Sequence, residues 1–179
     1  MRRLLVAVVL LLAACGGGHG SSSGPRNDAD VAFAQGLLAA DDQATEVVEL
    51  IRDHTSRPEL NRLADRVDGS RGQEITKVQG WLGSWGEPVE PGAGLDPELQ
   101  LPAGVLSDQQ LDQLNQLRDV RFDLAFVEAF TSHHRGVIEL ARRELHDGSL
   151  GEVKDLARQV VAGRQAEIDE LAAWKRAWS

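Results

Sequence analysis

The sequence is poor in the residues that hold soft metal ions or form covalent cross-links. Cys15 is its one cysteine and Met1 its one methionine, and it has no tyrosine. One cysteine excludes a disulfide within the chain and a metal cluster held by several thiolates. The one Gly-x-Ser-x-Gly match, residues 20–24, lies in a Gly/Ser-rich stretch with no strand pattern before it, and the chain lacks a glycine-rich phosphate loop and the Glu-x-x-His pairs of di-iron bundles. We therefore expect a protein that is not an enzyme.

The balance of charge excludes two classes of partner. The formal net charge is −9 at pH 7, which argues against binding to nucleic acid and against electrostatic adsorption to anionic lipid. The folded part, residues 30–179, is long enough for one domain with its own core. Nucleic acid is therefore not an expected partner, and contact with a membrane needs a covalent anchor.

The first residues have the pattern of a bacterial lipoprotein signal. Arg2 and Arg3 precede an apolar stretch, residues 4–12, that is too short to span a bilayer as a helix. Residues 12–15, Leu-Ala-Ala-Cys, form a lipobox, so we expect residues 1–14 to be removed and Cys15 to be lipidated. Residues 15–29 form a flexible tether. The sequence thus predicts an extracytoplasmic domain anchored to the bacterial cell membrane through the lipid on Cys15.

The rest of the chain repeats itself at an offset of about 93 residues. The offset aligns a first copy, residues 30–85, with a second copy, residues 119–179, and leaves a linker at 86–118. The matched pairs include Asp30 and Asp123, Phe33 and Phe126, Glu46 and Glu139, Arg71 and Arg164, Glu74 and Glu167, Trp81 and Trp174, and Trp85 and Trp178. The same alignment places His133 and His134 over Ala40 and Asp41. Any chemistry of the histidine pair is therefore absent or altered in the first copy.

Each copy has the apolar periodicity of two amphipathic helices. Apolar residues recur at spacings of three and four, with a break at residues 54–58 in the first copy and at 147–149 in the second. Two such hairpins bury their apolar stripes best against each other, so we predict an all-α four-helix bundle. Ser107 and Gln110 form a capping box that opens a short linker helix. We expect the four tryptophans to cover one end of the core together, and Gly148 to take the left-handed conformation that ends a helix.

His133 and His134 are the candidates for chemistry, because imidazoles bind divalent metal ions. Adjacent helical residues point about 100° apart, so a metal site here needs ligands from another helix. Asp41 of the other copy and Glu139 complete a predicted site of four ligands. In the alternative interpretation no metal binds, His133 is a core histidine hydrogen-bonded to Asp41 across the interface, and His134 lies at the surface.

Two blocks in each copy resemble the DUF305 family, a domain of unknown function. Residues 30–37 and 123–141 are similar to its first helix, and residues 74–85 and 167–178 to its second. The resemblance implies a ferritin-like four-helix bundle, frequent export and, in some members, copper binding or metal tolerance. Family members usually carry a Met-x-x-His-His block, whereas this chain has Phe130 at the methionine position, and it has Arg71 and Arg164 where a glutamine is usual. Without thioether ligands, imidazole and carboxylate favour Cu(II), Zn or Ni.

The sequence leaves two functions open. In the first, a lipid-anchored envelope protein binds one divalent metal ion through the His133 and His134 pair. In the second, the site of the family has decayed and the bundle is an adaptor that docks another protein of the cell envelope. Titration with metal ions separates the two hypotheses.

Overall fold

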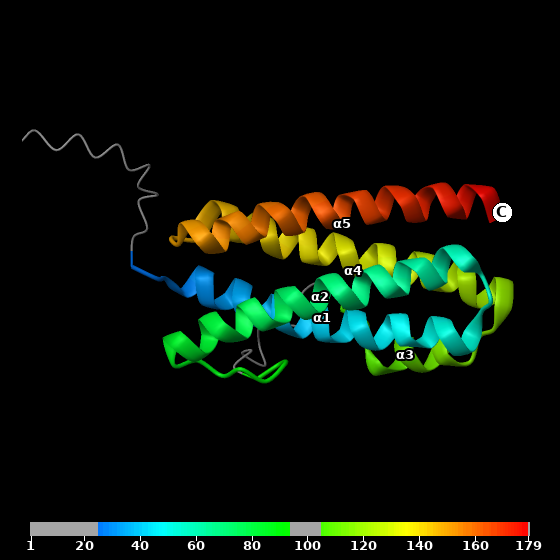
Figure 1. Ribbon diagram of the computed structural model, residues 1–179, viewed down its shortest axis with the longest axis horizontal. Helices are drawn as coiled ribbons and strands as arrows, with labels where there is room; N and C mark the ends of the chain where they lie inside the picture. Colours follow the sequence, from blue (N-terminus) through cyan, green and yellow to red (C-terminus); the bar gives the residue numbers. More distant parts are fainter. Residues whose placement is uncertain (1–24, 94–104, 179) are drawn as a thin grey trace, which may run out of the picture.

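The computed structural model describes residues 25–93 and 105–178, and every regular element within them is a helix. α1 (Asp28–His54) and α2 (Pro58–Trp85) form one hairpin, and α4 (Asp119–Asp147) and α5 (Gly151–Trp178) form the other. The short α3 (Asp108–Asn115) lies between them in the chain (Figure 1). The predicted all-helical fold is confirmed, with four long helices lying side by side.

The predicted signal peptide and the predicted lipidation site, Cys15, lie outside the described residues. None of the helices in 25–93 and 105–178 combines the length and the apolar character that crossing a membrane requires.

Local sequence sets the ends of the helices. The side chain of Asn27 and that of Asp30 form a capping box at the start of α1. Ser107 and Gln110 form the predicted capping box at the start of α3. Gly86 ends α2 at a φ of 75°, a left-handed conformation that only glycine adopts without strain.

Gly148 ends α4 at φ −64° and ψ 161°, so the predicted left-handed conformation is wrong. Close packing is the reason for a glycine, since a Cβ at this position would collide with the carboxyl group of Glu144. Glu144 is only 1% exposed, and its burial, together with the nearby charge of Asp30, raises its pKa to about 8. At neutral pH this carboxyl group therefore carries a proton.

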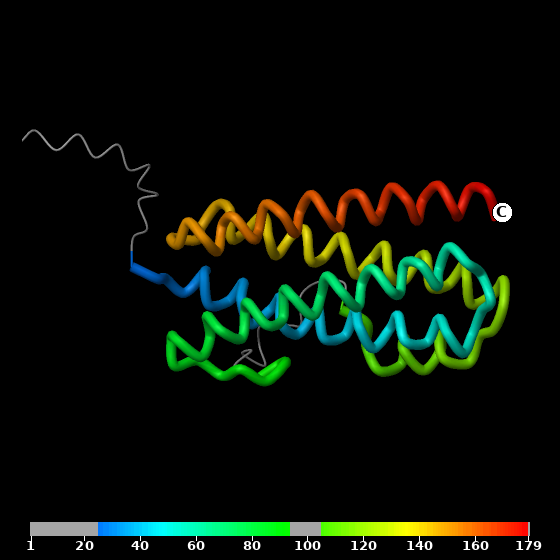
Figure 2. The backbone as a smooth tube through the Cα atoms, in the orientation of Figure 1, coloured from blue at the N-terminus to red at the C-terminus, as the bar shows by residue number. Residues whose placement is uncertain are grey.

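The two hairpins pack through α1 and α4, which run antiparallel (Figure 2). An approximate two-fold axis across the bundle thus relates the hairpins, and equivalent helix ends lie at opposite ends of the molecule (Figure 1). Trp81 and Trp85 stack together at one end, and Trp174 and Trp178 stack together at the other. The prediction that all four cover one end is wrong, because periodicity gives the faces of the helices but not the direction of the axis between the hairpins.

Two apolar clusters, one toward each end, make up the core. The cluster beside the α1–α2 turn includes Val47, Ile51, Leu60, Leu63, Val67, Phe122, Phe126 and Phe130. The cluster beside the α4–α5 turn includes Phe33, Leu37, Val78, Leu82, Val137, Val153, Leu156 and Val160. The side chains buried between them are polar, namely Asp41, Arg71, His133, His134 and Arg164.

Each end of the bundle is fastened by an aspartate from the opposite hairpin. Asp30 Oδ1 accepts hydrogen bonds from the backbone N–H groups of Ser149 and Leu150, at 3.0 and 2.9 Å. Its equivalent Asp123 accepts one from Nε of Arg57, at 2.6 Å. Both aspartates therefore tie the first turn of one hairpin to the interhelical turn of the other, and this fixes how the histidine-bearing α4 lies against α1.

Candidate functional site

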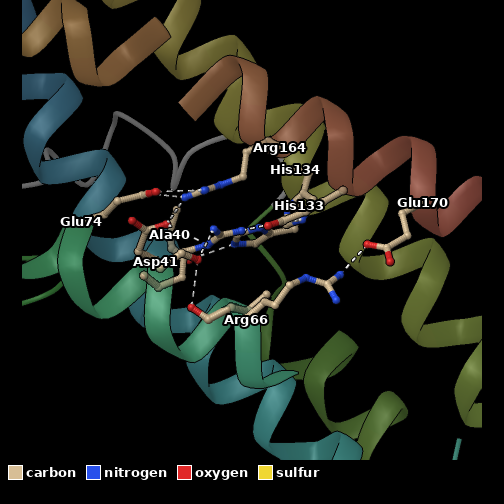
Figure 3. A network of polar contacts seen from close by, with 12 residues as sticks. Ala40, Asp41, Arg66, Glu74, His133, His134, Arg164 and Glu170 are labelled. Carbon is tan, nitrogen blue, oxygen red and sulfur yellow. Dashed lines mark hydrogen bonds and ion pairs between the residues drawn. The ribbon is translucent and has the colours of Figure 1, made fainter. Parts of the chain in front are cut away.

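A polar layer at the centre of the bundle is the candidate site (Figure 3). It comprises the five buried residues between the apolar clusters together with two less buried carboxylates, Glu74 and Glu167. The glutamate side chains are 18% and 17% exposed, so the layer reaches solvent along the seam between α2 and α5. Glu74 also lines a cleft of about 310 Å³ on this seam.

Two arginine–glutamate pairs cross the seam between the hairpins. Arg71 on α2 donates to Glu167 Oε2 on α5 at 2.6 Å, and Arg164 on α5 donates to Glu74 Oε2 on α2 at 2.5 Å. In the repeat Arg71 corresponds to Arg164, and Glu74 corresponds to Glu167. Each copy thus supplies the cation for the carboxylate of the other, and the approximate two-fold axis passes between the pairs.

Asp41 joins this network from α1. Arg164 donates to Asp41 Oδ1 at 2.7 Å, and Nε of Arg71 lies 3.7 Å from the same oxygen. Burial raises the pKa of Asp41 to about 8, although Arg164 opposes the rise; the charge of Glu74 adds to it. Burial alone would raise the pKa of Glu74, but the positive charge of Arg164 outweighs this effect, and the pKa is lowered. Asp41 is thus mainly protonated at neutral pH, beside the ionised Glu74.

The two imidazoles on α4 are buried and neutral. Nε2 of His133 lies 3.0 Å from the backbone oxygen of Ala40, which can only accept, so this nitrogen carries the proton. Nε2 of His134 lies 2.6 Å from Glu167 Oε2, although the contact is not aligned as a full hydrogen bond. Burial lowers the pKa of His133 to about 3 and that of His134 to about 4. Each ring therefore keeps a lone pair on Nδ1, and neither Nδ1 has a hydrogen-bond partner among the described residues.

The structure brings together three of the four predicted ligands. Asp41, His133 and His134 lie in the polar layer, and the two imidazole centroids are 5.8 Å apart. Glu139 does not join them, since it is exposed and lines a groove on the outer side of α4. Five residues separate it from His134, which turns it about 140° away around the helix. Within the described ranges, no three His, Cys, Asp or Glu side chains are grouped as metal ligands.

Two further expectations about the histidines need correction. The interpretation without metal predicts Asp41 as the hydrogen-bond partner of His133, but the observed partner is the carbonyl of Ala40. Asp41 instead accepts a hydrogen bond from Arg164. His134 is fully buried rather than at the surface. In the sequence the two arginines are a matched pair of the repeat and a departure from the family pattern, and neither feature gives them a place in the site. The sequence feature that could have located them is the Arg-x-x-Glu spacing, which occurs in both copies. With a two-fold axis between the hairpins, the arginine of each copy pairs with the glutamate of the other.

Comparisons with known proteins agree on the family and the fold. The sequence profile of DUF305, a domain of unknown function, matches residues 30–175. A candidate secreted DUF305 protein from Streptomyces coelicolor is 25% identical, with a TM-score of 0.76 over 84% of this chain and 92% of that one. A DUF305 fragment from Deinococcus radiodurans is 24% identical, with a TM-score of 0.76 over 86% of this chain and 99% of that one.

The metal-binding protein CopM shares the fold as well. In its Cu(II)-bound form it is 21% identical, with a TM-score of 0.71 over 84% of this chain and 97% of that one; structures of CopM with Cu(I) or silver also match. At this identity the likeness concerns the fold alone. No curated protein sequence matches the chain.

Proposed function

The chain belongs to the DUF305 family, and from this premise we propose that it is an exported, lipid-anchored envelope protein that binds one metal ion through His133 and His134. The observation that carries the proposal is the state of the two rings. Both are neutral, each holds Nε2 against an oxygen, and each leaves a buried Nδ1 lone pair without a partner. Histidines that bind metal ions have this arrangement, with the second nitrogen fixed by a carbonyl or a carboxylate.

The remaining ligands are not supplied by the carboxylates predicted from the sequence. Asp41 is held by Arg164, and Glu139 lies outside the polar layer. A closed tetrahedral zinc site needs four protein ligands, whereas the polar layer offers two imidazole nitrogens. Among the divalent ions Cu(II), Zn and Ni, Cu(II) has the highest affinity for such donors. We therefore expect copper as the ion, and CopM, a fold relative solved with copper, supports this choice.

A binding role suits these histidines better than a catalytic one. Their pKa values of about 3 and 4 lie far below neutral pH, so neither ring exchanges a proton readily there. The part of the polar layer nearest to solvent is the α2–α5 seam, where Glu74 lines the cleft. Export and anchoring have separate support in the lipobox at residues 12–15 and the tether that follows it.

Calorimetric titration of the chain without its predicted signal tests the metal proposal. Cu(II) is expected to bind with a dissociation constant at or below about one micromolar, with Zn(II) and Ni(II) weaker. His133→Ala together with His134→Ala should abolish this binding, while the control His146→Ala, at an exposed position on the same helix, should not. Affinity weaker than micromolar, or affinity that survives the double substitution, contradicts the proposal.

One observation favours the adaptor as a second candidate. The crossed pairs hold two guanidinium groups against two carboxylates, while Asp41 is mainly protonated and the imidazoles are neutral. The polar layer is thus close to electroneutral without a metal ion, and two fixed cations near the rings repel another. Crosslinking in the native envelope followed by pull-down tests this candidate, and recovery of the monomer alone counts against it.

A further inference from the structure

The outer face of α4 carries three arginines and a histidine, all exposed. Arg135, Arg142, Arg143 and His146 line a surface groove of about 730 Å³ between α4 and α5. Ile138 and Ile168 form its apolar floor. In a chain with a net charge of −9, such a concentration of positive charge in a groove indicates an anionic partner.

The arginines of the groove are not engaged elsewhere in the fold. All three are exposed, and none forms an ion pair with another described residue. Acidic groups only partly offset them: Glu139 lies in the groove, and Asp147 contacts His146 at 2.6 Å. The groove therefore keeps a positive surplus that folding does not use.

The equivalent face of the first copy has the opposite charge. In the repeat, Arg135, Arg142 and His146 correspond to residues 42, 49 and 53 of α1, which are Asp, Glu and Asp. With Glu46 they form the acidic face of α1: Asp42, Glu46, Glu49 and Asp53 are all exposed, and their carboxylates form no ion pair with described residues. The duplication has thus produced two helical faces with equivalent positions and opposite charge.

The two rows also have the same spacing. Steps of seven and four residues separate Arg135, Arg142 and His146, and the same steps separate the acidic residues at 42, 49 and 53. Two helices laid parallel would bring all three positions opposite one another in register. This register sets Asp42 opposite Arg135 and Glu49 opposite Arg142, and these two complementary pairs outnumber the one like-charge pair, Glu46 opposite Glu139. Complementary charge at matched intervals favours both the choice and the register of a partner.

From this match we propose that the protein associates with itself, the acidic face of α1 in one copy docking into the α4–α5 groove of a second copy. The surfaces differ, so each contact leaves a groove and an acidic face free for further copies. Net repulsion between the acidic chains is screened beyond about 8 Å at physiological ionic strength, and the paired rows act at shorter range. This inference is independent of the metal proposal, because no residue of the polar layer contributes to either face.

Charge reversal tests the interface. Sedimentation of the chain without its predicted signal, measured over a range of concentrations at physiological salt, should show a mass that keeps rising with concentration. Arg142→Glu or Glu49→Arg alone should each weaken association at least about tenfold, which corresponds to about 1.4 kcal/mol. A one-to-one mixture of the two variants should restore it, because the altered groove of one then meets the altered α1 of the other.

The control is Arg62→Glu, which changes the net charge equally on an exposed part of α2 away from both faces. It should leave association unchanged, and melting followed by circular dichroism should confirm that all the variants fold. A monomer at every concentration overturns the proposal, as do equal effects of Arg62→Glu and Arg142→Glu or a mixture that fails to associate. A monomer that binds polyglutamate through Arg142 would assign the groove to a different acidic partner and likewise overturn self-association.

Discussion

Asp41 and His134 occupy equivalent positions in the two copies, and each lies against the glutamate of its own hairpin. His134 Nε2 is 2.6 Å from Glu167 Oε2, and Asp41 and Glu74 are close enough that each contributes to the pKa shift of the other. One position uses a neutral imidazole and the other a protonated carboxyl group, so both present a neutral donor to an ionised glutamate. The duplicated fold therefore keeps one arrangement, a neutral group beside an ionised glutamate, with two different chemistries.

Asp41→Asn tests the protonation of this position. The folded state holds a proton on Asp41 up to a pKa of about 8, whereas the unfolded chain releases it near 3.8. Ionisation of the unfolded chain therefore lowers stability progressively between about pH 4 and pH 8. Asparagine cannot ionise, so the variant should gain stability relative to the natural protein as pH rises through this interval. Urea unfolding at pH 5 and pH 8 measures the difference. The control is Asp42→Asn, which changes the exposed neighbouring aspartate in the same way. A relative loss at pH 8 would show that Asp41 is ionised in the fold.

His133 should make the protein sensitive to acid. Its pKa falls from 6.5 to about 3 on folding, so the folded state binds fewer protons than the unfolded chain in this interval. The stabilisation is complete above pH 6.5 and is lost as pH falls toward 3. In His133→Gln the side-chain amide can still donate to the Ala40 carbonyl without titrating, so the loss of stability between pH 6.5 and 4 should become shallower. Thermal melting over this range measures the slope, which His146→Gln should not change. An unaltered slope in His133→Gln would rule out a proton-linked role.

The sequence predicts the helices well because apolar periodicity and the duplication can both be recognised along the chain without knowledge of its packing. The same periodicity does not give the direction of the two-fold axis between the hairpins. For this reason the prediction that all four tryptophans cover one end is wrong, and a stacked pair lies at each end. The repeat placed Asp41 opposite His134, and both lie in the polar layer. Glu139 is a carboxylate at a matched position of the repeat, but its angular position on α4 turns it outward, and the repeat alone does not give that angle.

Glycine positions give a prediction about the helices themselves. Gly163 lies inside α5, and a Cβ there would meet no neighbouring atom. Gly163→Ala should raise stability by about 0.5–1 kcal/mol, because alanine loses less backbone entropy in a helix. Gly86→Ala should lower it by about 1 kcal/mol, because the φ of 75° is strained for any side chain. Denaturant unfolding of the two variants should shift in opposite directions, and a shift in the same direction would contradict the assigned ends of α2.

The crossed pairs should contribute far more to stability than an exposed pair on the same seam. Arg164 is buried between Asp41 and Glu74, so Arg164→Met leaves the ionised Glu74 carboxylate without its partner and should cost about 3–5 kcal/mol. Adding Glu74→Gln should recover part of the loss, since the stranded charge is removed. Arg66 and Glu170 also join α2 to α5, but their side chains are 49% and 37% exposed, and Arg66→Met should cost less than about 1 kcal/mol. Chemical denaturation of all three variants gives the comparison. Equal losses in Arg164→Met and Arg66→Met would mean that the central layer is open to water, and the neutral, dry environment assigned to the histidines would then be wrong.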